Sequence, residues 1–424
     1  MLDIKFIREN PTAAKDGLRK KGITVDIDRL VELDGLHRER LQEIEKARAE
    51  LNVVSTEIAR GDKDKRVFAE DIKNRIKELE PEEERLRKEL ADLIELLPNL
   101  PAKDALEGKD ASGNKVVREG GKKPRLAFSP KDYLALAQAH DLIDIERAAK
   151  VSGSRFGYLK REAALLEFAL IRYAFDHLLH EEFIPVMPPA MIRPEVFKGM
   201  GRLTYDQLEE RYYLEKDDLY LVGSAEHTLG PLHKDEILEE KSLPIRYLGF
   251  STSFRREAGS YGKDTKGILR VHQFAKVEMF VFTTPDESDK ELGRLVSWQE
   301  RLVSGLGLPY RVVEICTGDI GWTDARQFDI EMWLPGQNNG KGEYRETHSA
   351  SNTTDFQARG VNVRFRSSVV GQRSKVDYVH MLNATAFAIG RTLIAILENY
   401  QQKDGSIVVP EALLPYVPFE KIAR

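Results

Sequence analysis

Hydrophobic positions in the first hundred residues repeat at helical spacing in two separate segments. One segment carries apolar side chains every three or four positions across residues 30–58, and the other carries two seven-residue series across residues 72–97. Because residues three, four and seven apart share one helix face, each segment predicts a helix with one apolar face. The charged turn ARGDKDK at residues 59–65 separates them, so the pattern predicts an antiparallel coiled-coil hairpin. At about 1.5 Å per residue, each arm would reach roughly 40 to 50 Å.

Pro81 lies inside the second helical segment. Proline removes a backbone donor and crowds the preceding turn, so a kink or a helix restart is expected there. The sequence PEEE that begins at Pro81 would suit a first helical turn. Periodicity alone favours a dimerisation or scaffolding role for the hairpin and leaves a binding role open.

The pattern changes near residue 105. Residues 98–125 are rich in Pro, Gly and Lys without a sustained period, which is typical of a linker. Residues 162–179 then predict a helix, residues 183–189 an extended segment and residues 277–284 a strand. We therefore expect a helical arm over residues 1–105, a linker over 106–128 and a second domain over 129–424. The linker ends in a basic cluster that is either solvated or a phosphate contact: Arg118, Lys122, Lys123 and Arg125.

Composition narrows the class of protein. Of 424 residues 41% are hydrophobic, which is ample for a globular interior, and no run approaches the roughly 20 apolar residues that span a bilayer. The charged N-terminus and the single Cys316 predict an unexported, cytoplasmic protein without disulfides or a multi-cysteine zinc site. With a net charge of -5, any nucleic acid must be bound by local patches. The sequence also lacks phosphate-binding loops of the Walker or dinucleotide type.

Residues 254–280, FRREAGSYGKDTKGILRVHQFAKVEMF, predict two antiparallel strands around a loop of turn residues. Alternation along the strands places Arg255 and Glu257 on one face, together with Arg270, Phe274 and Glu278. Guanidinium groups suit phosphate oxygens, a phenyl face suits a purine, and a carboxylate suits an amine or a hydroxyl. The alternative is an exposed hairpin with cross-strand ion pairs. Against it, Glu278 lies in a strand that is apolar on both faces and needs a partner.

The run MLNATAFAIGRTLIAILENYQQ at residues 381–402 predicts a helix that carries Arg391. An arginine on an apolar helix face is costly unless it meets an anion, so Arg391 indicates either a ligand site or a structural salt bridge. The residues expected around it on the helix are Ala384, Phe387, Ala388, Ile394 and Ala395.

Several motifs in order resemble those of bacterial-type seryl-tRNA synthetases, which are class II aminoacyl-tRNA synthetases. The three class motifs match FIPVMPPAMI, the 254–280 stretch, and NATAFAIGRTLIAILENYQ with Arg391. Between and before them stand GSAEH, CTGDIGWTDARQFDIEMWLP, EYRETHSASNTTDFQARG and AAKVSGSRFGYL. The resemblance covers essentially the whole chain.

This resemblance implies an α+β fold, in which a coiled-coil hairpin precedes a catalytic domain made of an antiparallel sheet flanked by helices. It implies a homodimer built around the first motif, and it makes the front hairpin a tRNA-binding arm. The implied reaction activates L-serine with ATP to seryl-adenylate and transfers the seryl group to the terminal ribose of tRNA(Ser), and also of tRNA(Sec).

The resemblance also assigns residues to the ATP site. Arg255 would hold the α-phosphate and the serine carboxylate, Glu257 the adenine amino edge, and Phe274 would stack on adenine. Arg270 and Arg391 would neutralise the β and γ phosphates. Glu346 and Ser349 match magnesium-binding positions, and their oxygens are suitable ligands for Mg²⁺. Of these, the implied catalytic residues are Arg255, Glu346 and Arg391.

The implied serine pocket includes two carboxylates and several hydroxyl or amide side chains. A carboxylate wall would receive the substrate ammonium, while Glu278 with Thr385 would bond its hydroxyl. A pocket built to pair a hydroxyl strongly rejects the analogue that lacks it, whereas threonine must be excluded by shape. The full implied set is Ser224, Glu226, Arg255, Glu278, Asn383 and Thr385.

Four positions depart from the family pattern. The family commonly has Thr where Ser224 stands, Gly at Ala384, Cys at Ala350 and a second Arg at Gly360. Each proposed ligand is still present, so we expect effects on affinity and turnover rather than on the reaction class.

Two other functions are compatible with parts of the sequence. An activator that loads serine onto a carrier other than tRNA would keep the motifs but need no long arm. A catalytically silent nucleic-acid-binding protein would keep the arm but lose Arg255, Glu346 or Arg391, and all three are present.

Overall fold

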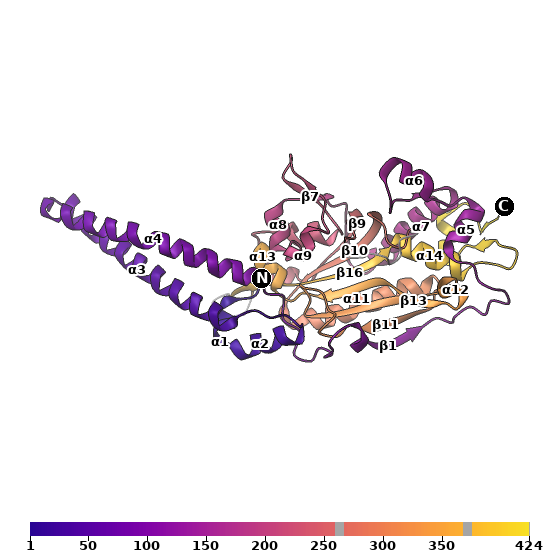
Figure 1. The fold of residues 1–424 in the computed structure, drawn as a ribbon, viewed down its shortest axis with the longest axis horizontal. Helices are drawn as coiled ribbons and strands as arrows, with labels where there is room; N and C mark the ends of the chain where they lie inside the picture. The colour runs from indigo at the N-terminus through magenta and orange to yellow at the C-terminus, as the bar shows by residue number, and fades with distance from the viewer. Residues whose placement is uncertain (259–266, 368–374, 424) are drawn as a thin grey trace. The chain divides into compact units, whose positions relative to one another are not determined.

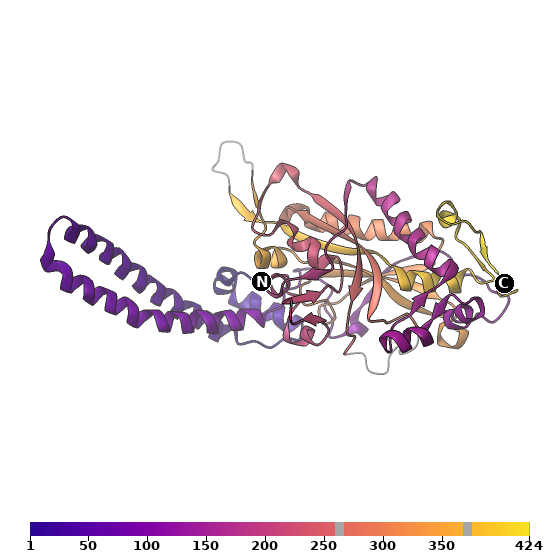
Figure 2. The same cartoon turned by 90° about the horizontal axis from the view of Figure 1, so that it is seen from above.

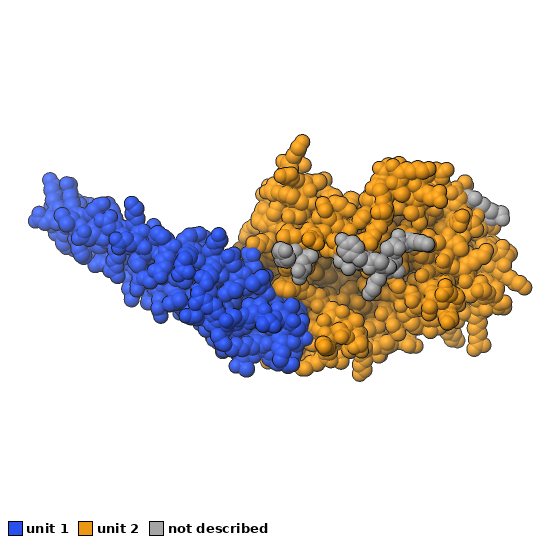
Figure 3. Space-filling view, in the orientation of Figure 1, with its two compact units in different colours: residues 1–100 blue, residues 101–424 orange. Residues whose placement is uncertain are grey.

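The computed structural model describes residues 1–258, 267–367 and 375–423, and it contains two compact units. These are Met1–Leu100 and Pro101–Arg424, coloured separately in Figure 3. Within the described residues, no helix has the length and apolar character needed to cross a membrane.

The first unit is a helical hairpin preceded by two short helices. The long helices α3 and α4 run side by side in both views (Figures 1 and 2), which confirms the predicted antiparallel coiled coil. Asp26 caps α3 by accepting a hydrogen bond from the backbone N–H of Arg29 at 2.9 Å. The helices are α1 (Ile4–Glu9), α2 (Pro11–Lys20), α3 (Ile27–Ala59) and α4 (Arg66–Glu95), with the turn η1 (Lys63–Lys65).

Two apolar clusters hold the hairpin together along its length. Their members come from both arms at the spacing that the sequence predicts, so the apolar faces of α3 and α4 are buried against each other. Nearer the base the buried residues include Leu30, Leu33, Leu86 and Leu90, and nearer the tip Ala47, Val54, Ala69, Ile72 and Ile76.

Pro81 does not restart the second arm. Helix α4 is continuous from Arg66 to Glu95 with the proline inside it, so the expectation of a restart is wrong. Pro81 is exposed, which lets water reach the backbone carbonyl that the proline leaves without its usual donor.

The second unit is built on an eight-stranded sheet with the order β1-β11-β12-β13-β16-β10-β9-β4. All neighbours are antiparallel except β4 and β9, which confirms the predicted antiparallel sheet. The strands are β1 (Lys115–Gly120), β4 (Phe183–Val186), β9 (Ile245–Phe254), β10 (Gln273–Thr283), β11 (Tyr310–Glu314), β12 (Arg326–Leu334), β13 (Glu343–Asn352) and β16 (His380–Ala388).

Strand β10 shows how the sheet divides core from cavity. Its residues Val277, Met279 and Val281 are buried in one core with apolar side chains of three helices, α7 (Arg161–Leu179), α11 (Ser288–Gly305) and α14 (Ile389–Asn399). Alternation then turns positions 274, 276 and 278 to the other face, where they line a cavity. The period of two along one strand therefore positions the site.

The remaining elements are short. The helices are α5 (Tyr133–His140), α6 (Ile145–Ser152), α8 (Pro194–Gly199), α9 (Tyr205–Leu208), α10 (Glu226–Leu229), α12 (Gln337–Gly340) and α13 (Phe356–Val361). The strands are β2 (Ile143–Asp144), β3 (Tyr158–Leu159), β5 (Met191–Ile192), β6 (Tyr213–Leu214), β7 (Leu219–Leu221), β8 (Ile237–Glu239), β14 (Arg364–Arg366), β15 (Val376–Tyr378), β17 (Ile407–Val408) and β18 (Lys421–Ile422).

The predicted helix over residues 381–402 is only half correct. Strand β16 occupies most of its first part, and α14 begins at Ile389. Because β16 is buried on both faces in the middle of the sheet, its apolar run carries no alternation that would distinguish it from a buried helix. Arg391 therefore lies in the first turn of α14, where the helix N-terminus favours anions.

The segment expected to be a linker, residues 106–128, contains an edge strand of the main sheet. Strand β1 pairs with β11 from Lys115 to Gly120. The predicted basic cluster is partly used inside the fold, because Arg118 forms an ion pair with Glu300 at 2.8 Å and the Lys123 ammonium lies 3.7 Å from the Trp333 ring centroid. An edge strand exposes half of its backbone to water, so its polar sequence resembles a linker.

Glu398 in α14 joins three segments of the second unit. Its carboxylate accepts hydrogen bonds from the backbone N–H groups of Tyr133 at 3.0 Å and Gly336 at 2.8 Å, and from the side chain of Gln337. Burial raises the pKa of Glu398 to about 7, although these donors lower it. A fully buried carboxylate here fixes the start of α5 against the end of α14.

Replacing Glu398 with alanine is expected to lower the free energy of unfolding by about 3 kcal/mol, because three donors would be left unpaired. Urea denaturation measures this loss, and Glu398→Gln is the matched control that retains an acceptor. Because the folded pKa is raised, the proton is favoured in the folded state. The wild-type stability relative to Glu398→Gln should therefore fall as the pH rises from below the ordinary carboxyl pKa through 7. Equal stability of the alanine variant and the wild type would contradict the role.

Candidate active site

A cavity of about 290 Å³ lies on the face of the sheet opposite the α7, α11 and α14 core. Its walls come from β10, β13, β16, the start of α14 and the segments that flank the β9–β10 hairpin. Eleven of the twelve residues expected from the sequence line it: Glu226, Arg255, Glu257, Arg270, Phe274, Glu278, Glu346, Ser349, Asn383, Thr385 and Arg391. The twelfth, Ser224, is buried behind the wall, where its hydroxyl accepts a hydrogen bond from Lys276 at 3.3 Å.

The hairpin itself is confirmed, but its strands are shorter than predicted. Strand β9 ends at Phe254 and β10 begins at Gln273, so Arg255, Glu257 and Arg270 are not on strands and alternation does not place them. The predicted loop over residues 258–267 lies largely outside the described residues.

A turn beyond the strand brings the charged residues together instead. The backbone N–H of Arg255 still donates to the backbone carbonyl of His272 at 3.0 Å. Two residues later, Glu257 adopts a left-handed conformation with φ of 52°. Its carboxylate accepts a hydrogen bond from Arg270 at 2.8 Å. A non-glycine residue with positive φ is strained, and such strain is concentrated at functional sites.

Arg255 is held on two sides. Its Nε donates to the carbonyl of Gly223 at 3.2 Å, and its guanidinium lies 5.3 Å from the centroid of the Phe274 ring. Burial lowers the pKa of Arg255. The charge of Glu257 raises this pKa, and the charge of the nearby Arg391 lowers it further. Arg255 and Arg391 both line the cavity, and their guanidinium groups suit an anion.

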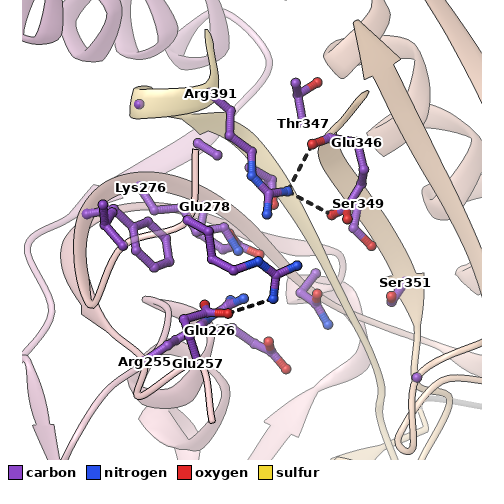
Figure 4. Close-up of a pocket in the computed structure, with 18 of the residues that line it drawn as sticks. Glu226, Arg255, Glu257, Lys276, Glu278, Glu346, Thr347, Ser349, Ser351 and Arg391 are labelled. Atoms are coloured by element: carbon purple, nitrogen blue, oxygen red, sulfur yellow. Dashed lines mark hydrogen bonds and ion pairs between the residues drawn. The ribbon is translucent and has the colours of Figure 1, made fainter. Parts of the chain in front are cut away.

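Arg391 and Glu346 point toward each other across the cavity (Figure 4). The guanidinium donates to the Glu346 carbonyl at 2.9 Å and lies 3.3 Å from its carboxylate. Ser349 is on the same strand as Glu346. The cross-strand partner of Ser349 on the neighbouring strand β12 is Asp329. Burial and the charge of Glu346 raise the pKa of Asp329 to about 8. Asp329 is a carboxylate beside the site that the sequence analysis missed.

At the other end of the cavity, two buried carboxylates each have a cationic partner. Glu226 accepts hydrogen bonds from Arg202 at 2.7 Å and Gln357 at 3.0 Å, and Glu278 forms an ion pair with Lys276 at 2.6 Å. Burial raises the pKa of Glu226, but Arg202 brings it below its ordinary value. For Glu278 burial prevails over Lys276, and the pKa is raised.

An irregularity in the β10–β16 ladder positions the polar groups beside Glu278. The register shifts after Val277, which makes Thr385 the direct cross-strand partner of Glu278. The side-chain nitrogen of Asn383 is buried without a hydrogen-bond partner in the part of the chain that the structure describes. A buried donor of this kind is suited to a polar ligand.

Several cavity residues were missed by the sequence analysis, and Lys276 and Arg202 show two different reasons. Lys276 shares the strand and the parity of Phe274 and Glu278, so alternation could have identified it. Arg202 lies in a loop after α8 and reaches the site only through the tertiary fold, so no local pattern could have identified it.

Comparison with known proteins agrees with this fold. Residues 209–400 match the tRNA synthetase class II core domain (G, H, P, S and T), which places the second unit in that class. Residues 1–101 match the seryl-tRNA synthetase N-terminal domain. The chain belongs to the seryl-tRNA synthetase family.

Its relatives extend over the full chain. The serine–tRNA ligase of Dictyoglomus turgidum is 44% identical, with 100% of this chain and 99% of the relative covered. The seryl-tRNA synthetase of Pyrococcus horikoshii, solved in complex with ATP, superposes with a TM-score of 0.90 at 41% identity, covering 100% and 99% of the two chains. The cytoplasmic serine–tRNA ligase of Naegleria fowleri, in complex with AMP, gives 0.88 at 32% identity, covering 100% and 98%.

Proposed function

We propose that the cavity binds ATP and L-serine side by side and that its two ends carry the activation step of a serine–tRNA ligase. Family membership gives the ligase activity itself. The observation that carries the assignment is that one cavity holds guanidinium groups suited to phosphates together with a buried carboxylate and hydroxyl suited to serine. Arg255 and Arg391 stand at one end, and Glu278 with its cross-strand partner Thr385 stands at the other.

At the phosphate end, the arginines would hold the charge that develops during attack. Arg255 would bind the α-phosphate and the serine carboxylate, and Arg391 and Arg270 the β and γ phosphates. The Phe274 ring lines the cavity beside the Arg255 guanidinium and would stack on adenine, and Glu257 would accept from the adenine amino group.

Mg²⁺ is proposed at Glu346 and Ser349. Both side chains line the cavity on β13, and carboxylate and hydroxyl oxygens suit this ion. Among the described residues no three His, Cys, Asp or Glu side chains group as a metal site. Mg²⁺ is commonly held by one or two carboxylates together with substrate phosphates, so the donor set fits. The ion would neutralise phosphate charge, while Arg391 orients Glu346.

At the serine end, Glu226 and Glu278 would receive the ammonium and the hydroxyl. Asn383 contributes a buried donor that has no partner within the described residues, and Thr385 lies opposite Glu278. Ser224 accepts a hydrogen bond from the backbone of Glu226 at 3.2 Å and one from Lys276, so it supports both carboxylates from behind.

The reaction follows from this placement. The serine carboxylate attacks the α-phosphorus, the bond to the pyrophosphate oxygen breaks, and seryl-adenylate forms. A hydroxyl of the terminal tRNA ribose then attacks the acyl carbon and releases AMP. Positioning and charge neutralisation account for catalysis, so a dedicated general base is not required.

Serine-dependent ATP–pyrophosphate exchange tests the activation step, and charging of tRNA tests the transfer. Alanine and threonine serve as competing amino acids in the same assay. Absence of serine-dependent exchange by the purified chain would refute the proposed site.

The hairpin of α3 and α4 is proposed as the tRNA-binding arm of residues 1–105. A chain of residues 101–424 should retain pyrophosphate exchange within about threefold but lose most tRNA charging, because the arm would supply backbone and shape contacts with the body of tRNA(Ser). Exchange reports that the shortened chain is folded. Undiminished charging of tRNA by this shortened chain would refute the tRNA-binding role of the arm.

The second acceptor, tRNA(Sec), stays a prediction, which charging assays with each purified tRNA would decide.

A homodimer is proposed through the first class motif. Several large apolar side chains of α7, β4 and the segment after it are exposed, and a dimer interface would cover them. They include Leu165, which is 43% exposed, Phe168 at 68%, Ile184 at 48% and Met187 at 73%.

A further inference from the structure

A second cavity of about 330 Å³ adjoins the first beyond Arg255. The two cavities share five charged wall residues, Arg202, Glu226, Arg255, Glu257 and Arg270. The second cavity adds side chains from α9 and from the residues that follow it, and the roles assigned above do not use them: Gln207, Glu210 and Arg211, together with His227 of α10.

Arg211 is fixed in this wall without an acidic partner. Its Nε donates to the carbonyl of Arg202 at 3.4 Å, and its guanidinium lies 5.3 Å from the centroid of the Phe197 ring. A Cβ at Gly223 would lie 2.9 Å from Nη1 of Arg211, so that glycine leaves the space which the guanidinium occupies. Within the described residues, no carboxylate lies at ion-pair distance from Arg211.

The other acids near Arg211 are engaged or outnumbered. Glu226 is paired with Arg202, and Glu257 with Arg270. The cavity wall holds four arginines and three glutamates, and burial together with the neighbouring arginines lowers the pKa of His227 well below its ordinary value. Burial together with the charges of Arg255 and Arg202 lowers the pKa of Arg211 to about 10.

Because Arg211 has no carboxylate at ion-pair distance within the described residues, its guanidinium is available to an anion that enters the second cavity. The phosphates of ATP are assigned to the first cavity, and Arg211 does not line it. The remaining anionic substrate is tRNA, whose terminal ribose must reach the acyl carbon beside Arg255. A guanidinium matches the paired oxygens of a phosphodiester.

We infer that Arg211 and the second cavity bind the last phosphodiester of the tRNA 3′ end and so position the terminal ribose for attack. This inference rests on the ligase activity and adds a tRNA subsite to it. The side-chain oxygen of Gln207 is buried without a hydrogen-bond partner in the described ranges. It lies in the same wall and can accept a hydrogen bond from a ribose hydroxyl.

The test compares Arg211→Met and Arg211→Lys with the wild type in two assays. Arg211→Met should lower kcat/KM for tRNA by about 10- to 100-fold, the range for losing a hydrogen-bonded charged contact. Serine and ATP should keep KM values within about twofold of wild type in pyrophosphate exchange. Arg211→Lys should recover part of the loss. Arg193→Met, at an exposed arginine outside both cavities, is the matched control and should charge tRNA normally.

A second measurement addresses the phosphate directly. A tRNA can be made in which an electrically neutral methylphosphonate replaces the last phosphodiester. The wild type should aminoacylate this tRNA as slowly as Arg211→Met aminoacylates normal tRNA. On the methylphosphonate tRNA, Arg211→Met and the wild type should have the same kcat/KM. If Arg211→Met lowered kcat/KM by the same factor on both tRNAs, or raised the KM for serine or ATP, the assignment would be overturned. Failure of the ligase function would instead appear as absent exchange in the wild type.

Discussion

Replacing Arg255 with alanine is expected to lower serine-dependent ATP–pyrophosphate exchange by at least about 10³-fold, the scale on which preorganised cationic contacts act in phosphoryl transfer. Arg255 lines the phosphate end of the cavity, where its Nε donates to the carbonyl of Gly223 and its guanidinium lies over the Phe274 ring. The group therefore requires no reorganisation when negative charge develops on the α-phosphate. Steady-state exchange measured at saturating serine and ATP reports the loss in kcat.

Arg256→Ala provides the matched control one residue along the chain. The Arg256 guanidinium lies 5.1 Å from the centroid of the Tyr212 ring and does not line the first cavity. This variant should keep exchange within a few-fold of wild type. Both variants should unfold in urea at the wild-type midpoint, which separates catalysis from stability. Exchange by Arg255→Ala within tenfold of wild type would refute the catalytic role of Arg255.

The arm and the hairpin of β9 and β10 were predictable because each carries a clean local period. Apolar spacing in α3 and α4 gave the coiled coil, and alternation in β10 gave the shared face of Phe274 and Glu278. Arg255, Glu257 and Arg270 were assigned to that face for the wrong reason. These three residues lie beyond the ends of the strands. Glu257 has a positive φ, and its carboxylate accepts a hydrogen bond from Arg270.

Other parts of the structure depend on tertiary packing that no local pattern records. Strand β16 reads as a helix because both of its faces are buried, and β1 reads as a linker because it is an edge. Arg202 and Asp329 reach the site through loops and strand pairing that are set by distant segments. No local pattern therefore assigned Arg202 or Asp329 to the site.

The departures from the family pattern fit their surroundings. Ala350 and Ala384 are direct cross-strand partners and both are fully buried. The family's larger Cys and smaller Gly would fill the same space with the volumes exchanged. A Cβ at Gly360 would lie 1.8 Å from the carbonyl oxygen of Gly199, so a second arginine would require that contact to open. We therefore expect a substitution at Ala350 or Ala384 to be tolerated best when the other position is substituted as well, and a substitution at Gly360 when its contact with Gly199 is opened.

Replacing Glu278 with alanine is expected to lower the serine-to-alanine ratio of kcat/KM by about 10² or more. A site that pairs a substrate hydroxyl rejects the analogue without it by roughly 10⁴ to 10⁵, because the buried polar groups are then unpaired. Glu278 is 1% exposed and is held by Lys276 at 2.6 Å opposite Thr385, so bound alanine would leave its carboxylate without a substrate partner. Exchange kinetics with each amino acid measure the ratio.

The threonine reaction is an internal control for this change. Threonine keeps the hydroxyl and is excluded mainly by shape, at about 1 to 3 kcal/mol for a methyl group, so its ratio to serine should move less than that of alanine. Glu278→Gln should lose less discrimination than Glu278→Ala because its amide oxygen still accepts a hydrogen bond. An unchanged serine-to-alanine ratio in the alanine variant would show that hydroxyl recognition lies elsewhere. Asn383 would then be the next residue to replace, since its buried nitrogen has no partner within the described residues.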